Sequence, residues 1–295
     1  MKRSRTGQGP RQPPRPAPKA VKAACESSDD ESSAESNASK ASTVQLHFDV
    51  CELRSNYGAR VQYLFDSWLP DPGVGGKISD HEKFSDAAVK AMDAGLVVFT
   101  GTGTSSDDDD DDNEEADVNA EDEDDIFGVA GILLFTKLQR VDKQCASELV
   151  TLLSHPTKTV TDGTELSTLF SSGRGAILMN EHMRNLPPQL TFQVVAAATN
   201  DFVTSSKKPE LALLLGKAQL VAGDDQHGQK AEKQWYFWRD EDEALFAKRD
   251  KRVAVNAYKC PPMFDGQSDS DVPWVVVFGV SLLDVPKILT LNPTR

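Results

Sequence analysis

The first patterned stretch of the chain alternates apolar and polar residues. Over residues 44–51 every second position is Val, Leu or Phe, which is the period of a strand with one buried face. Apolar residues then recur at helical spacing, which predicts a helix over 56–69. Asn56 is a suitable N-cap for that helix, and Pro70 ends it because proline lacks the N–H that a continuing helix needs. The folded part therefore opens with a strand followed by a helix.

The same two periods continue to the end of the chain. A second helix is predicted over 80–94, a short strand over 96–100 and, after an interruption, a long apolar strand over 126–138. Helices are further predicted over 141–155, 162–170, 186–202, 240–249 and 282–291, strands over 175–181, 234–238 and 272–280, and residues 211–222 fit either a helix or a buried strand. Because helices and strands alternate, the fold class is α/β or α+β, with a single mixed sheet covered by helices.

Two stretches interrupt this pattern and are predicted to be disordered. Residues 1–42 contain no aromatic side chain and many Pro, Ser, Ala, Lys and Arg, and residues 101–125 are almost wholly polar. Neither stretch can bury enough apolar surface to offset the entropy lost on ordering. We therefore expect a disordered tail over 1–42 and one domain over 43–295, which a disordered acidic loop interrupts at 101–125.

The net charge of −14 comes from one place in the chain. Fourteen of the 46 acidic residues lie between Asp107 and Asp125, where there is no Lys or Arg, and the other 32 acids match the 32 bases. Such a block repels nucleic acid and anionic membranes and attracts basic proteins. We therefore expect no direct contact with nucleic acid. No segment is apolar enough to predict membrane insertion.

This acidic run is the main candidate for a binding element, and three interpretations of it are open. A calcium site would need the glycine turn and fixed ligand spacing of an EF-hand loop, which it lacks. A spacer would need neither its length nor its charge. A partner-binding element could contact Lys/Arg-rich surfaces through many weak, salt-sensitive contacts. The carboxylates concerned are Asp107, Asp108, Asp109, Asp110, Asp111, Asp112, Glu114, Glu115, Asp117, Glu121, Asp122, Glu123, Asp124 and Asp125.

The N-terminal tail carries two candidate signals. Residues 1–22 are basic with no acid, and Lys2, Arg3 and Arg5 are compatible with nuclear import. Ser27, Ser28 and Ser32 each lie three residues before an acid, which suits an acid-directed kinase. A phosphate would add roughly 1.5–2 negative charges at each site. A tail that only increases solubility fits the same residues equally well.

No motif of a known enzyme class is found. The five histidines and four cysteines form neither HExxH nor CxxC, so the sequence predicts no metal site, no cofactor and no disulfide framework. His182 could form an acid–base pair with Glu181, although a structural or exposed histidine is the commoner case. Cys145 falls on the apolar face of its helix and is expected in the core. The glycines of 173–175 precede a strand, so they fit a helix cap and a turn better than a phosphate-binding loop.

Several stretches, taken in order, resemble the BCCIP family. They are "VQLHFDV", "DEDDIFGVAGILLFTKLQ" at the end of the acidic run, "CASELVTLL", and the aromatic strand and acidic helix "YFWRDEDEALFAKRD". The most specific is "GAILMNEHMRNLPPQL", in which a hydrophobic strand leads to Asn-Glu-His and then to the Asn-Leu-Pro-Pro-Gln run of residues 185–189. The resemblance covers roughly residues 43–290 and is loosest over 203–235.

The resemblance implies a fold similar to the GCN5-related acetyltransferases without their catalytic motifs. Active members carry [QR]xxGx[GA] to hold the cofactor, and here Phe170 stands where Gln or Arg is needed. The family is named for binding a breast-cancer susceptibility protein and a cyclin-dependent-kinase inhibitor. It implies a non-enzymatic nuclear chaperone or escort, shuttling to the cytoplasm, that binds a basic large-subunit ribosomal protein during ribosome biogenesis and nuclear export. Nuclear transport factors are further implied partners. The alternatives are a regulatory adaptor for cell-cycle or DNA-repair proteins and a degenerate acetyltransferase.

Overall fold

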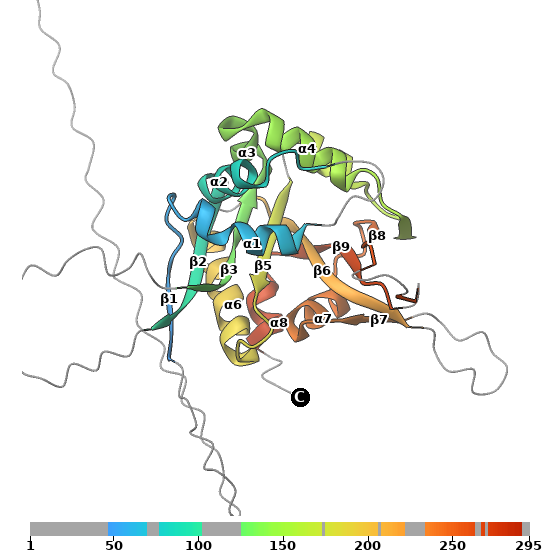
Figure 1. Cartoon of the computed structure of the whole chain (residues 1–295). Helices are drawn as coiled ribbons and strands as arrows, with labels where there is room; N and C mark the ends of the chain where they lie inside the picture. The colour runs from blue at the N-terminus through green and yellow to red at the C-terminus, as the bar shows by residue number, and fades with distance from the viewer. Residues whose placement is uncertain are drawn as a thin grey trace, which may run out of the picture.

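The computed structural model describes residues 47–69, 77–101, 125–172, 175–205, 208–221, 234–262, 267–268 and 271–290. These residues build one mixed sheet with helices on both faces (Figure 1), which confirms the predicted α/β class. The strands are β1 (His47–Glu52), β2 (Met92–Gly101), β3 (Ile126–Leu134), β4 (Lys158–Thr161), β5 (Ala176–His182), β6 (Leu211–Val221), β7 (Gln234–Phe237), β8 (Val255–Lys259) and β9 (Trp274–Ser281).

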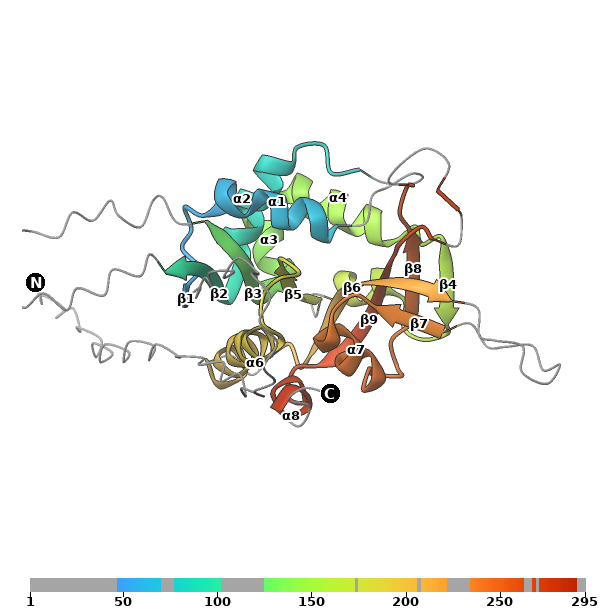
Figure 2. The same cartoon turned by 60° about the horizontal axis from the view of Figure 1, so that its bottom comes forward.

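The helices form one layer on each side of the sheet (Figure 2). The first layer is α1 (Gly58–Trp68), α2 (His81–Ala91), α3 (Phe135–Val141), α4 (Lys143–Leu153) and α5 (Leu166–Ser171). The second is α6 (Pro188–Ser205), α7 (Asp240–Ala247) and α8 (Val285–Thr290). Each layer encloses its own hydrophobic core, with Phe65 and Phe84 in the first and Phe202 and Phe278 in the second. The central strands β3, β5 and β9 are therefore buried on both faces.

Strand order explains where the sheet is weakest. The order is β1-β2-β3-β5-β6-β9-β8-β4, with β7 paired to β6. All neighbours are antiparallel except β5 and β6, which are parallel and joined only at Ile177/Leu213 and Leu178/Leu214. Beyond these two pairs β5 and β6 are no longer joined. A gap therefore opens in the middle of the sheet, on the side where both parallel strands end.

The two strands that flank the acidic run are neighbours. Phe99 of β2 pairs with Ile126 of β3, and Gly101, at the end of β2, pairs with His47 of β1. Gly101 belongs to a strand, although it was predicted as the first residue of the disordered loop. Residues 1–46 and 102–124 lie outside the described residues, and so do the predicted tail and most of the predicted loop.

Tertiary packing decides where several elements differ from their predictions. The apolar stretch 126–138 is a strand only to Leu134, after which α3 directs Phe135 and Leu138 into the first core. The segment that fitted a helix or a strand is β6. Its alternate residues enter the two hydrophobic cores on opposite faces of the sheet, so its sequence shows no apolar–polar alternation. Strands β4 and β8 were not predicted, because each is short and lacks a clear alternation.

Helix ends also differ from the sequence-based expectation. Asn56 does not cap α1; the N-cap is Tyr57, without a side-chain bond, and its buried ring meets Phe99 edge to face. The second helix stops at Ala91, and β2 begins at Met92. Within β2 the positive φ of Ala94, 51°, coincides with a shift of register against β3 between Asp93 and Leu96. Asp80 provides the helix start there, since its side chain accepts a hydrogen bond from the N–H of Lys83 at 3.0 Å.

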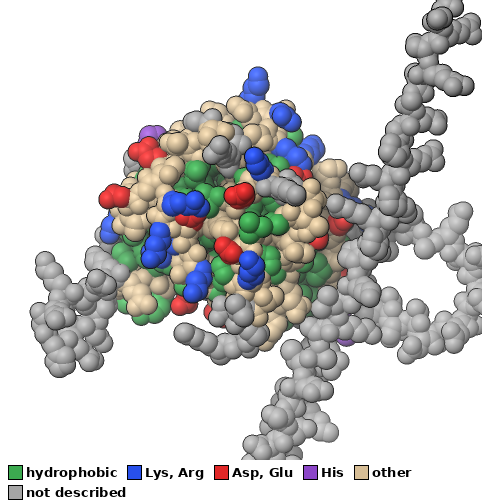
Figure 3. All heavy atoms as spheres, turned by 180° about the vertical axis from the view of Figure 1, so that it is seen from behind, with side chains coloured by type: hydrophobic (Ala, Val, Ile, Leu, Met, Phe, Trp, Pro, Cys, Tyr) green, Lys and Arg blue, Asp and Glu red, His purple; other side chains and the backbone are tan. Residues whose placement is uncertain are grey.

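The face seen from behind carries Lys/Arg and Asp/Glu side chains interspersed with hydrophobic ones (Figure 3). No acidic field covers that face, which agrees with the balance of charges outside the acidic run. No helix among the described residues is long and apolar enough to cross a membrane.

Candidate functional site

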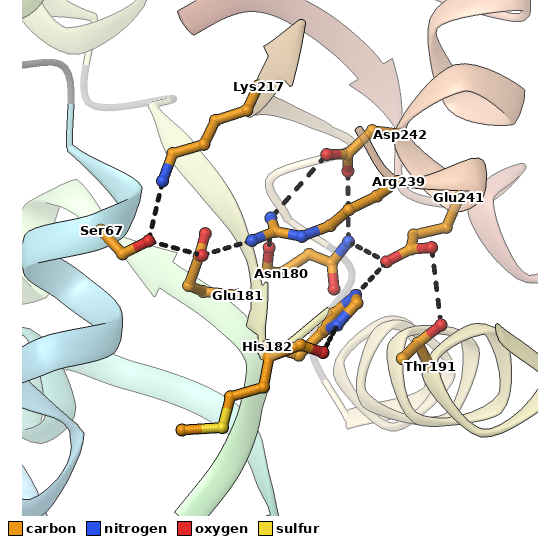
Figure 4. A network of polar contacts seen from close by, with 10 residues as sticks. Ser67, Asn180, Glu181, His182, Thr191, Lys217, Arg239, Glu241 and Asp242 are labelled. Carbon is orange, nitrogen blue, oxygen red and sulfur yellow. Dashed lines mark hydrogen bonds and ion pairs between the residues drawn. The ribbon is translucent and has the colours of Figure 1, made fainter. Parts of the chain in front are cut away.

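A buried group of charged side chains fills the gap between β5 and β6 (Figure 4). We call it the central charge cluster; its members are Asn180, Glu181, His182, Arg239, Glu241 and Asp242. The guanidinium of Arg239 crosses the gap and donates through NH1 to the backbone carbonyl of Asn180 at 2.8 Å. That carbonyl faces the gap, where β6 no longer lies alongside, so an arginine side chain takes the place of a strand. Through NH2 the same guanidinium pairs with Glu181.

Strand periodicity explains how the cluster reaches both faces of the sheet. Glu181 follows Met179 on the face of the first core, whereas Asn180 and His182 follow Leu178 on the face of the second. Asn180 accordingly donates from Nδ2 to Glu241 at 3.1 Å and to Asp242 at 3.2 Å. The cluster thus links β5 to the first turn of α7.

Glu181 is bound from two sides, by Arg239 at the start of α7 and by Ser67 of α1. Its Oε1 accepts hydrogen bonds from Arg239 and from the hydroxyl of Ser67 at 3.1 Å, and that hydroxyl in turn accepts from Lys217 Nζ at 2.7 Å (Figure 4). Its other oxygen, Oε2, is buried and has no hydrogen-bond partner. Burial lowers the pKa of Lys217, Glu181 acts against this shift, and Arg239 and Arg184 add to it. The positive charge of Lys217 is therefore only partly compensated by the carboxylate of Glu181.

Glu241 and Asp242 lie at the start of α7 on the other side. The helix predicted over 240–249 is confirmed, and it has acids in its first turn, where carboxylates suit the helix dipole. Burial alone would raise the pKa of Glu241, but its hydrogen bond with His182 and the charge of that side chain lower it. Asp242 is fully buried, and burial raises its pKa to about 7; Arg239 acts against this shift and Glu241 adds to it.

A groove opens to solvent directly over the cluster. Its smaller lobe, of 240 Å³, is lined by Tyr63, Leu64, Ser67, Glu181, His182, Met183, Arg184, Lys217, Trp238 and Arg239. A larger lobe, of 400 Å³, continues past Trp238 towards Pro188 and Thr191 of α6 and also includes Asp240 and Glu241. The guanidinium of Arg184 lies over the ring of Trp238, 4.3 Å from its centroid. We call the two lobes together the Trp238 groove.

The acidic run returns to the domain beside this groove. Of its fourteen carboxylates only Asp125 is described, and it is exposed. The N–H of Met183 donates to the carbonyl of Phe127 at 2.8 Å, so the start of β3 lies beside the end of β5. Burial and, after it, the charge of Asp125 raise the pKa of Tyr63. The last carboxylate of the run is therefore close to the groove's smaller lobe.

The other predicted site residues fall outside the description or take structural roles. Asp107 to Asp124, the import candidates Lys2, Arg3 and Arg5, and Ser27, Ser28 and Ser32 lie outside the described residues. Cys145 is buried in the core as expected, and burial raises its pKa to about 11. His182 does not bond Glu181; the alternation of β5 turns the two side chains to opposite faces, and His182 pairs with Glu241 instead.

Next to the start of β5, the described residues Phe170 and Gly175 are packed against apolar side chains. Phe170 is buried and stacks on Phe135, with ring centroids 4.9 Å apart. A Cβ on Gly175 would lie 2.7 Å from the Phe170 ring, so this glycine is needed for close packing of the ring. The predicted cap at Gly173 lies outside the described residues. No group of three or more His, Cys, Asp or Glu side chains that could hold a metal occurs in the described part of the chain.

Sequence reasoning missed the central charge cluster. Glu241 and Asp242 looked like solvated acids at a helix start, and Arg239 looked like part of the same polar stretch. One signal was available, because "NEH" continues a strand whose other residues are all apolar. Polar residues at the end of a buried strand need buried partners.

Comparison with known proteins gives a family and a likeness among solved structures. The model of the BCCIP family matches residues 43–245. Among solved structures, a crystal structure of BCP1 from Saccharomyces cerevisiae is similar, with 10% sequence identity and a TM-score of 0.45, over 87% of this chain and 91% of that chain. A comparison with curated proteins finds no match.

Arg239→Met should be strongly destabilising. The change keeps much of the side-chain volume but leaves Glu181 and Asp242 buried without their guanidinium, which typically costs about 3–5 kcal/mol. The free energy of unfolding from urea titration measures this loss. Arg252→Met is the matched control, because Arg252 also binds a carboxylate, that of Asp250, but is 84% exposed. Equal stability of the two variants would contradict a structural role for the cluster.

Asp242→Asn should change how stability depends on pH. Because the pKa of Asp242 is about 7 in the folded protein and 3.8 is its ordinary value, the folded state holds one extra proton between these pH values. The contribution of Asp242 to the free energy of unfolding is therefore greatest below about pH 4. It falls as the pH rises to about 7, by at most about 1.4 kcal/mol per pH unit.

The asparagine cannot titrate, so the variant should gain stability relative to the wild type over that window and no further above it. Urea unfolding at several pH values measures the difference. Asp240→Asn, an exposed position at the same helix end, controls for loss of one charge. A wild-type-to-variant difference that is constant with pH would show that Asp242 does not titrate there.

Proposed function

The chain belongs to the BCCIP family, and we propose that it is a non-enzymatic nuclear chaperone or escort that binds a basic client. Membership of the family supports a chaperone-like or adaptor role in general. We further propose that the client is a large-subunit ribosomal protein, that the chain acts in ribosome biogenesis and nuclear transport, and that it shuttles between nucleus and cytoplasm. Nuclear transport factors would then be its further partners.

One observation supports this proposal above the others. The acidic run, which holds the whole excess of negative charge, rejoins the domain at Asp125, beside the exposed side chains of the Trp238 groove. A flexible series of carboxylates can neutralise a Lys/Arg surface but encodes little shape. A folded surface next to it can add contacts that depend on shape. A free ribosomal protein exposes the basic surface that binds RNA in the ribosome. It therefore needs a partner that neutralises this charge and also recognises its shape.

A regulatory adaptor for cell-cycle or DNA-repair proteins is the alternative. It would use the same acidic run and the same groove, and it would differ from the escort only in the protein that it binds. Both belong to the class of binding proteins that family membership supports.

A degenerate acetyltransferase is the enzyme alternative, and we propose that the chain resembles that fold without its chemistry. Ligands of open sheets bind where neighbouring parallel strands end. Here that gap is filled by Arg239, Asn180 and Asp242. At the described ends of the segment that would hold a cofactor pyrophosphate, Gly175 lies close against the ring of Phe170.

Neutralising the acidic run should weaken client binding. We would replace every Asp and Glu of 107–124 by Asn or Gln, which keeps the length of the run, and measure binding to purified large-subunit ribosomal proteins at two salt concentrations. The wild-type affinity should fall steeply with salt, and the variant should bind more weakly at low salt with a flatter dependence, because the ionic contacts are gone. Thermal melting should be unchanged. Equal binding of the two chains at low salt would refute the electrostatic part of the proposal.

Acetyl-CoA should not bind. Calorimetric titration of the full chain with acetyl-CoA should give no saturable heat, because side chains occupy both the gap and the loop. Saturable binding in the micromolar range would favour the acetyltransferase instead. Titration with CoA alone is the control that separates recognition of the acetyl group from nonspecific binding of a polyanion to the groove's cations.

A further inference from the structure

The smaller lobe of the Trp238 groove has a chemistry that the Lys and Arg side chains of a basic client do not match. Exposed large apolar side chains gather around it: Tyr63 and Met183 are each 41% exposed and Trp238 is 37% exposed. Val221 and Tyr236 extend this surface along the β6–β7 hairpin, because they lie on the same strand face as Lys217 and Trp238. Five of the seven large hydrophobic side chains that are exposed among the described residues are therefore in one region. Clustered exposure of this kind marks a surface that binds something.

The charges of the smaller lobe are predominantly positive. Arg184, Lys217 and Arg239 line it, against the single carboxylate of Glu181. His182, the remaining titratable side chain that reaches the lobe from β5, is bonded to Glu241. Arg184 and Lys217 both lie over the Trp238 ring, at 4.3 and 6.0 Å from its centroid. Two partly solvated cations thus flank one exposed aromatic side chain.

The excess of positive charge in the smaller lobe determines which kind of protein segment can bind there. A Lys/Arg-rich segment would meet Arg184 and Lys217 and be repelled. A carboxylate could instead pair with both, and an aromatic or large aliphatic side chain beside it could pack on Trp238, Met183 and Tyr63. Asp240 and Glu241 line the larger lobe only, so the preference for an acid is local to the smaller one.

We infer that the smaller lobe of the Trp238 groove binds an acidic segment of a second partner protein, a segment that also carries a large apolar side chain. The chain's own acidic run is close enough to compete, but between Asp107 and Asp125 its apolar residues are only Ala116, Val118 and Ala120. The run therefore offers carboxylates but no large apolar side chain that could pack on Trp238. With a basic client on the run and an acidic segment in the groove, the protein would join two partners of opposite charge. The groove's specificity does not depend on the proposed client.

Peptide selection tests the inference without assuming a partner. A random peptide library displayed on phage is selected on the full chain, and in parallel on the chain with the neutralised run. Enrichment of peptides that combine Asp or Glu with Trp, Phe or Leu is expected on both. Enrichment of Lys/Arg peptides, or no enrichment, would overturn the inference.

Point variants then locate the site. Binding of a selected, fluorescein-labelled peptide is measured by fluorescence anisotropy. Lys217→Met and Trp238→Ala should each weaken it about tenfold or more, as expected for a central contact of an interface. Lys90→Met and Leu283→Ala, which change an exposed cation and an exposed leucine away from the groove, should not. Unchanged affinity in both groove variants would contradict the proposed site.

The neutralised run separates the two proposals. Neutralising the run should weaken binding of the basic client. The affinity for the selected peptide should stay equal or rise, because the run no longer competes for the groove. Peptide binding that appears only in the neutralised chain would assign the groove to the chain's own acidic run and overturn the inference. If ribosomal proteins do not bind but the selected peptide does, the proposed client is refuted and the inference about the groove stands.

Discussion

The rest of the structure depends on how one arginine closes the middle of the sheet. Of two parallel strands, β5 pairs along its whole length with β3 and β6 pairs with β9 from Leu211 to Ala218, but β5 and β6 share only two residue pairs with each other. Arg239 spans the gap beyond these pairs and bonds the free carbonyl of Asn180 on the way to Glu181. The two halves of the sheet, with the helices that cover them, are thereby connected by charge-assisted hydrogen bonds as well as by backbone pairing.

Closing the gap with ions has a cost that an apolar plug would not have. Three carboxylates and one guanidinium have left water, and two carboxylate oxygens, Glu181 Oε2 and Asp242 Oδ2, have no hydrogen-bond partner. Burial of this kind seldom adds net stability. Its benefit is a fixed arrangement: β5, α1 and α7 are held in one relative position, and the rim of the Trp238 groove is made from these elements and the end of β6.

The sequence predicted the fold where periodicity was local and missed what only the assembled fold creates. The long helices α4 and α6 and the buried strand β9 follow from apolar spacing and prolines. The change from strand to helix at Phe135 could not be predicted, because the apolar run continues across it and only packing against the first core sets the boundary.

The candidate site was less accessible to the same reasoning. The acidic run is visible in composition, but Arg239, Glu241 and Asp242 are indistinguishable in sequence from a solvated helix start. Their burial depends on a gap between β5 and β6, which α6 separates in the chain, and no local pattern records that gap. The groove cations Arg184 and Lys217 likewise become neighbours only through Trp238.

The pairing of Phe99 with Ile126 has a consequence for how this chain can vary. Both ends of the acidic run are fixed by adjacent antiparallel strands, so an insertion between them leaves the strand register unchanged. The entropy of closing a flexible loop grows only slowly, by about 0.6 kcal/mol for each doubling of its length. Relatives could therefore differ widely in the number of carboxylates at this point while keeping the same domain, and the strength of their electrostatic attraction could evolve separately from the specificity of their folded surface.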